Sequence, residues 1–216
     1  MKIRLLFIIS LLSICTYIIS QNGVSAEVIF TMSYKGITPD ELLEMPKKVT
    51  YLVSGSNTKQ IVVTPNSTMY VIANGDSVFL ANLNDIEDDR VGTFYYADDI
   101  VESTAIFDIK IKPTRDMKTI LGYPCKKYVV KIHNKETNEK MKDIVYTTEK
   151  IGGENVNFLL YKGLKGFILS SEKTNGKEIT TMTAKKVLKK DIPPSAFLVP
   201  EEYIITTYKE QINLDK

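Results

Sequence analysis

Every second side chain is apolar in two short stretches, FDIKIK at Phe107–Lys112 and YVVKI at Tyr128–Ile132. Successive side chains of a strand point to opposite faces, so this period of two predicts two strands that each have one apolar face. A sheet with a single apolar face must fold over a core. The two stretches therefore predict an antiparallel β protein whose sheet is folded over its apolar side chains.

Outward from these stretches, the same alternation recurs in short runs that Gly, Asn, Asp or Pro interrupts, which is typical of antiparallel strands and turns. Asn74-Gly75-Asp76 and Asn175-Gly176 predict tight hairpins, because Asn and Gly accept the positive φ that such turns require. No linker or internal repeat divides residues 27–216, so we expect a single antiparallel β domain there. The expected strands are Glu27–Tyr34, Lys48–Ser54, Gln60–Thr64, Met69–Ala73, Ser77–Leu83, Thr93–Ala97, Thr104–Lys112, Tyr123–His133, Glu139–Thr148, Gly166–Glu172 and Lys177–Lys189.

A short helix is predicted after Thr38, because Thr38 can cap its start, Pro39 suits its first turn and Glu41 completes a capping box. Pro46 ends it. The apolar side chains that we expect to pack on the sheet are Leu42, Leu43 and Met45. Two further helical candidates are Glu154–Tyr161 and a single turn at Pro193–Phe197.

The first residues have the composition of a secretory signal. Lys2 and Arg4 precede an almost wholly apolar run, Leu5–Ile19, and small polar residues follow. This run is shorter than the roughly 18–20 residues that a transmembrane helix needs. We therefore expect export to the periplasm or the outer surface of the envelope. The signal peptide is expected to be residues 1–26, with cleavage after Ala26, or to end after Ser20.

Each of the two cysteines has a structural interpretation. Leu12–Cys15 is close to a lipoprotein box, but Ile14 stands where that box normally has a small residue, so we expect Cys15 to be part of the signal peptide and not a lipid anchor. Once the signal is removed, Cys125 is alone and no intramolecular disulfide can form. Lys127 shares its side of the strand and could activate it, but we expect Cys125 to be a buried structural residue.

Charge argues against a nucleic-acid partner, since the chain without Lys2 and Arg4 has equal numbers of basic and acidic residues. The charges are nevertheless uneven, which is compatible with solvated faces or with a contact surface for a charged partner. The acidic cluster is Asp85, Glu87, Asp88, Asp89, Asp98, Asp99 and Glu102, and the basic residues of the second half include Lys126, Lys127, Lys131, Lys185, Lys186, Lys189 and Lys190.

Catalytic and metal-binding motifs are not recognisable in the sequence. His133 is the only histidine, so any Ser-His-Asp or Cys-His arrangement would have to use it. A zinc site needs several His or Cys ligands, and Arg90 stands where a calcium-binding EF-hand loop requires glycine. We expect no enzyme activity, no catalytic residues, no metal site and no cofactor.

Four segments resemble the domain of unknown function 4412, a family of secreted Bacteroidetes proteins that looks like a relative of the outer-membrane lipoprotein carriers. They are Ile120–Lys127, Val145–Thr148, Met182–Val187 and Ile192–Pro200. A weaker similarity is to the family named for the string Gly-Leu-Pro-Gly-Leu-Ile. Here Gly163–Ile168 reads GLKGFI, with Lys165 in place of the proline and Phe167 in place of a leucine.

The resemblance implies a mainly β fold, a curved antiparallel sheet or incomplete β-barrel with one or two short covering helices and a concave face suited to acyl chains. We expect a non-enzymatic envelope protein that binds a lipid or other hydrophobic ligand on that face. The alternative is a structural or interaction module whose charged faces and sheet edges contact another envelope protein. The candidate ligand-binding residues are Phe107, Ile109, Tyr128, Val130, Ile132, Tyr146 and Phe167.

Overall fold

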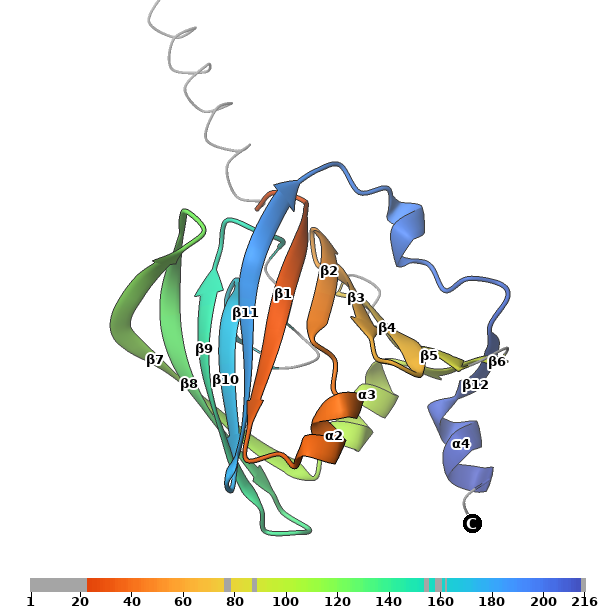
Figure 1. Ribbon diagram of the computed structural model, residues 1–216. Helices are drawn as coiled ribbons and strands as arrows, with labels where there is room; N and C mark the ends of the chain where they lie inside the picture. Colours follow the sequence, from red (N-terminus) through yellow and green to blue (C-terminus); the bar gives the residue numbers. More distant parts are fainter. Residues whose placement is uncertain are drawn as a thin grey trace, which may run out of the picture.

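The computed structural model describes residues 23–75, 79–86, 89–153, 156–157, 161 and 163–214. Within these residues the chain forms one sheet and a few short helices (Figure 1). The strands are β1 (Ala26–Lys35), β2 (Lys48–Ser54), β3 (Asn57–Val63), β4 (Ser67–Asn74), β5 (Phe79–Ile86), β6 (Asp89–Tyr95), β7 (Phe107–Ile120), β8 (Tyr123–Asn134), β9 (Lys140–Thr148), β10 (Phe167–Asn175), β11 (Glu178–Lys189) and β12 (Ile204–Thr207). The helices are α2 (Pro39–Glu44), α3 (Ala97–Thr104), α4 (Tyr208–Leu214) and the 3₁₀ turn η1 (Pro194–Phe197).

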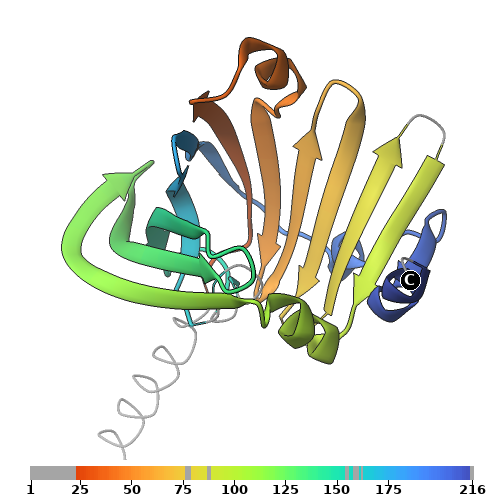
Figure 2. The same cartoon turned by 90° about the horizontal axis from the view of Figure 1, so that it is seen from below.

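The strand order across the sheet is β12-β6-β5-β4-β3-β2-β1-β11-β10-β9-β8-β7. Two antiparallel meanders, β1–β6 and β7–β11, are joined where β1 pairs with β11. Helix α3 links β6 to β7, and β7 is the strand at the other edge of the sheet. β7 starts beside α3 and is strongly curved (Figure 2). The two edges do not pair in the described part of the chain, so the predicted mainly β, curved and open sheet is confirmed.

One face of this sheet, which we call the concave face, is continuous from β8 to β6. Across the first meander the cross-strand row is Phe30, Val49, Val62, Met69, Asn84 and Val91. In the second meander the same face bears Tyr128, paired with Val145, and Met182, paired with Met32. Because side chains opposite one another share a face, these rows form one continuous and mostly apolar face.

The other face of the first meander is covered by the C-terminal strap, which we define as residues 190–203. Ile72, Ala81 and Leu83 are buried on that face against Ile192 and Phe197 of the strap. The strap crosses β3 to β6 on the side away from β7 (Figures 1 and 2). Strands β3 to β6 therefore have apolar side chains on both faces, as a sheet covered on both sides requires.

The connection between β9 and β10 packs onto the concave face. Ile151 and Val156 join the cluster around Phe30, and Tyr161 and Leu164 join the cluster around Val130. All four of these connection side chains are buried. The concave face is therefore partly filled by the chain itself, beside β8 to β10 and β1 to β2.

Helix α2 forms where predicted but does not pack where expected. Thr38 accepts a hydrogen bond from the Glu41 amide at 3.4 Å, and the Glu41 carboxylate accepts one from the Thr38 amide at 3.0 Å, so the capping box is confirmed. However, α2 buries none of its residues, and the expected packing of Leu42 and Leu43 on the sheet is wrong. The physical reason is its position, because the six-residue helix lies in the β1–β2 connection beyond the end of the sheet (Figure 1).

Three other elements differ from the sequence expectations. The strand expected at Thr104–Lys112 begins later, after α3, and continues as β7 to Ile120. β12, which was not predicted, pairs with β6 in parallel within a sheet whose other strand pairs are antiparallel. Helix α4 follows it. The single turn expected at Pro193–Phe197 is confirmed as η1, whereas the helix expected at Glu154–Tyr161 lies mostly outside the described residues, as does Asp76 of the first hairpin signal.

Candidate ligand-binding face

Four of the seven candidate residues meet on the concave face of β7 and β8. Tyr128, Val130 and Ile132 are buried in one cluster, and Phe107 packs against it. Their alternation along β7 and β8 was the signal that predicted them. Tyr161 and Leu164 of the β9–β10 connection cover this cluster.

The other three candidates lie outside this cluster. Phe167 is buried against Phe30 and Tyr51, with ring centroids 6.2 and 5.6 Å away. Ile109 pairs with Ile132 but stays 37 % exposed near the open edge of the sheet. Tyr146 follows Val145 directly in β9, so its side chain points away from the Tyr128 cluster. It packs instead against the cluster that contains Phe30 and Phe167, and the Lys118 ammonium lies 3.6 Å from the centre of its ring. The structure therefore separates Tyr146 from Tyr128 but groups it with Phe167.

Part of the concave face is exposed to solvent, and its residues were not predicted from the sequence. Met69 and Val91, in β4 and β6, are 38 % and 40 % exposed, and Val71 and Leu80 beside them are half-buried. Asn82 and Asn84 of β5 lie in the same cross-strand rows and add amide groups to this apolar surface. The signal was present, because Met69–Ala73 is wholly apolar and a continuous apolar strand indicates cover on both faces.

Asp143 is an ionisable side chain buried in the concave face. It is 1 % exposed, pairs with Val130 across the β8–β9 ladder, and accepts a hydrogen bond from the Tyr161 hydroxyl. Burial raises the pKa of its carboxyl to about 6, against the attraction of Lys173. Its other oxygen has no hydrogen-bond partner among the described residues. Asp143 is therefore a polar group that a neighbouring ligand could engage.

The groups that sequence analysis weighed for catalysis and metal binding are dispersed. His133 hydrogen-bonds Asn138 at 2.8 Å across the β8–β9 turn, and Asp85 accepts a hydrogen bond from Tyr203 at 2.5 Å. Among the described residues, no three His, Cys, Asp or Glu side chains are grouped so that they could hold a metal ion. Within those same residues, no helix is long and apolar enough to span a membrane.

Cys125 is fully buried, as expected for a structural residue. Burial raises the pKa of its thiol, against the effects of a backbone hydrogen bond and of Lys118. We therefore expect a thiol reagent to modify the native protein about a hundredfold more slowly than the protein unfolded in denaturant, because modification of a buried thiol needs local opening. Time-resolved mass spectrometry of the labelled protein measures this. Equal rates in the two states would show that Cys125 is accessible.

The fold and this face define a structural class, an open and curved, mainly antiparallel sheet with an apolar concave face. No family model matches the chain, and no curated protein matches it. Among solved structures, LprF from Mycobacterium bovis is similar at 10 % identity and a TM-score of 0.32, over 82 % of this chain and 90 % of that chain. The class assignment rests on the strand order and register above, and the two family resemblances stay predictions.

Proposed function

We propose that the protein is an exported, non-enzymatic protein of the cell envelope that binds a lipid or another hydrophobic molecule on its concave face. The observation that supports this proposal is the partly exposed apolar surface of Met69, Val71, Leu80 and Val91. An apolar concave surface with a few amide groups is the usual composition of a small-molecule site. The buried clusters beside it extend the same apolar face as far as β8.

A fluorescent fatty acid tests this proposal. We expect it to bind the native protein, and we expect Val71→Lys to weaken binding about tenfold or more, because a charge would then face the acyl chain. The matched control is Leu198→Lys in the strap, which lies on the other side of the sheet and should leave binding unchanged. Equal loss in both variants, or no binding by the native protein, would contradict the proposal, as would native mass spectrometry that finds no co-purifying lipid.

The alternative proposal, an interaction module, has β7 as its candidate surface. β7 is a long edge strand with mostly exposed side chains, and an unpaired edge can accept a strand from another protein. Pro113 and the register shift between Pro113 and Met117 interrupt this edge, which weakens it as a template for pairing. Crosslinking in intact cells through Lys112, compared with Lys35 in β1, tests whether a partner protein lies against β7.

For export, we propose cleavage after Ser20 instead of after Ala26. Residues 23–26 are built into the fold: the Val24 amide donates to the Lys150 carbonyl at 2.9 Å, and Ala26 is fully buried between β2 and β11. Removing them would cost several backbone hydrogen bonds and part of the core. We expect mass spectrometry of the exported protein to find Gln21 as its first residue. A first residue of Glu27 would refute this prediction.

A further inference from the structure

The turn of the β7–β8 hairpin has an unusual residue at its tip. Ile120 pairs with Tyr123, so Leu121 and Gly122 form a two-residue turn, and both have positive φ, +50° and +83°. Asn or Gly normally occupies the first of these positions. Leu121 is instead a branched apolar side chain, 47 % exposed, in a backbone conformation that such residues rarely adopt. Outliers of this kind often mark functional sites.

Two lysines lie beside this tip. They come from the loop after β9 and from the end of β11, and neither forms an ion pair with any described residue. They are Lys150 and Lys189. Lys150 and Lys189 line an open hollow of about 480 Å³ together with Gly23 and Gly122, and Glu149 is the acidic residue in its wall. This end of the molecule is therefore apolar at its tip and positively charged around it.

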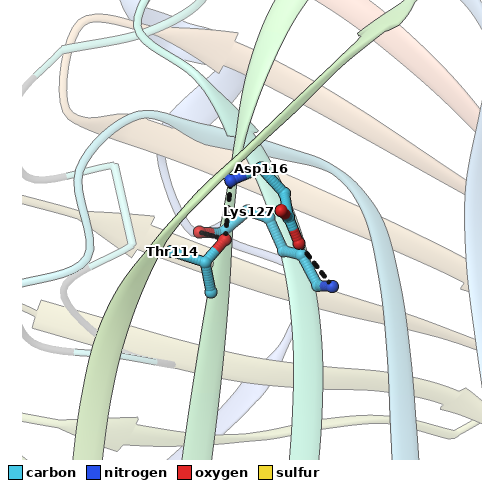
Figure 3. Close-up of polar contacts among 3 residues, drawn as sticks. All are labelled: Thr114, Asp116 and Lys127. Carbon is cyan, nitrogen blue, oxygen red and sulfur yellow. Dashed lines mark hydrogen bonds and ion pairs between the residues drawn. The ribbon is translucent and has the colours of Figure 1, made fainter.

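The middle of the β7–β8 hairpin is held by polar contacts (Figure 3). The Thr114 hydroxyl donates to the Lys127 carbonyl at 3.3 Å and accepts from the Asp116 amide at 3.1 Å, and Lys127 donates to the Asp116 carboxylate at 2.9 Å. These bonds bridge the segment where the β7–β8 register shifts. They also pair the charges of Lys127 and Asp116, so these two residues add no net charge to the hairpin.

The opposite end of the molecule has an exposed leucine without this charge. Leu43 of α2 is 65 % exposed, and its neighbours on the helix are acidic, namely Asp40, Glu41 and Glu44. The hairpin tip, the start of β1 and the end of β11 lie at one end of the sheet, and α2 lies at the other (Figure 1).

We infer that the hairpin end docks on a lipid bilayer that carries anionic headgroups. Leu121 enters the interface between headgroups and acyl chains, and Lys150 and Lys189 contact the lipid phosphates around it. Charge complementarity favours this occupant. Docking at this end is independent of whether the concave face holds a lipid.

Vesicle co-sedimentation of the signal-processed protein tests the apolar tip. We expect binding to phosphatidylcholine vesicles that contain phosphatidylglycerol, and we expect Leu121→Asn to weaken it about tenfold. Asn is favoured at this turn position, so the variant keeps the fold, which its thermal unfolding verifies. The matched control is Leu43→Asn, which removes an exposed leucine from the acidic end and leaves binding unchanged. Equal effects of the two variants would overturn the inference.

A second set of variants tests the charge. Lys150→Glu with Lys189→Glu should weaken binding to anionic vesicles by more than about tenfold, since each basic residue near the surface contributes roughly a factor of five. Lys110→Glu with Lys142→Glu changes the same charge towards the other end of β7 and β9 and should have little effect. Equal binding to pure phosphatidylcholine vesicles, or equal loss in the two double variants, would contradict docking at this end.

The chain contains no tryptophan, so one introduced residue reports on depth. We expect the fluorescence of Leu121→Trp to shift to shorter wavelength when anionic vesicles are added, because the indole leaves water. Leu43→Trp should show no shift. A shift at residue 43 without one at residue 121 would place the membrane at the wrong end and refute the proposal.

Discussion

Replacing Phe30 by alanine is expected to lower the free energy of unfolding by about 3–5 kcal/mol, the range for truncating an aromatic side chain in a packed core. Phe30 is fully buried and stands in β1, the strand that joins the two meanders. Its ring contacts Tyr51 at 5.4 Å and Phe167 at 6.2 Å between centroids, so its loss leaves a cavity between β2 and β10. Urea unfolding followed by circular dichroism measures the change.

Two variants separate this effect from a general response to mutation. Phe30→Leu keeps an apolar side chain of similar volume and should cost less, about 1–2 kcal/mol. Leu198→Ala removes an exposed side chain from the strap and should change stability by less than about 0.5 kcal/mol. A loss below about 1 kcal/mol for Phe30→Ala would show that the cluster around Phe30 is not the main core.

Asp143→Asn is expected to stabilise the protein at neutral pH and to remove part of its pH dependence. The pKa of Asp143 is about 6 in the folded protein, against 3.8 for a free side chain, because burial disfavours the charged form. The folded state therefore binds more protons than the unfolded state between these values, and stability falls as pH rises through them. A shift of this size corresponds to a loss on the order of 3 kcal/mol that is complete above about pH 7.

Unfolding of the native protein and the variant between pH 3.5 and 7.5 measures this effect. Asparagine can still accept the hydrogen bond from Tyr161, so the variant should gain relative stability as pH rises and reach a plateau above about pH 7. Asp108→Asn is the control, because that carboxylate is exposed and pairs with Lys110 at 3.1 Å. Parallel pH profiles for the native protein and Asp143→Asn would contradict the raised pKa.

Strands could be predicted wherever one face is buried, because burial imposes the alternation, as in β8 and β11. Elements without that pattern were missed. Helix α3 begins after Tyr96, which is not a usual cap, although the Asp99 carboxylate accepts a hydrogen bond from its amide at 2.9 Å. β7 continues past Pro113 because an edge strand tolerates proline. β12 has only four residues, and Ile204 within it is exposed.

The candidate site could be predicted only in part, for related reasons. Tyr128, Val130 and Ile132 share one strand, so their alternation defines one face. Tyr146 follows Val145 directly in β9, and local alternation does not decide which of these two neighbours points towards the Tyr128 cluster. Asp143 had a signal that was overlooked, since it occupies an inward position between Met141 and Val145 in β9. Its burial depends on the β9–β10 connection, which local sequence patterns do not place.

The position of β1 has a consequence for the order in which the molecule folds. β1 is among the first strands to be synthesised, yet one of its two neighbours is β11, and Ala26 faces Lys189. Nearly the whole chain must therefore have left the ribosome before the meanders can join, and contacts between such distant residues slow folding. A chain that stops before β11 would retain two separate half-sheets with open edges, which favours aggregation over refolding.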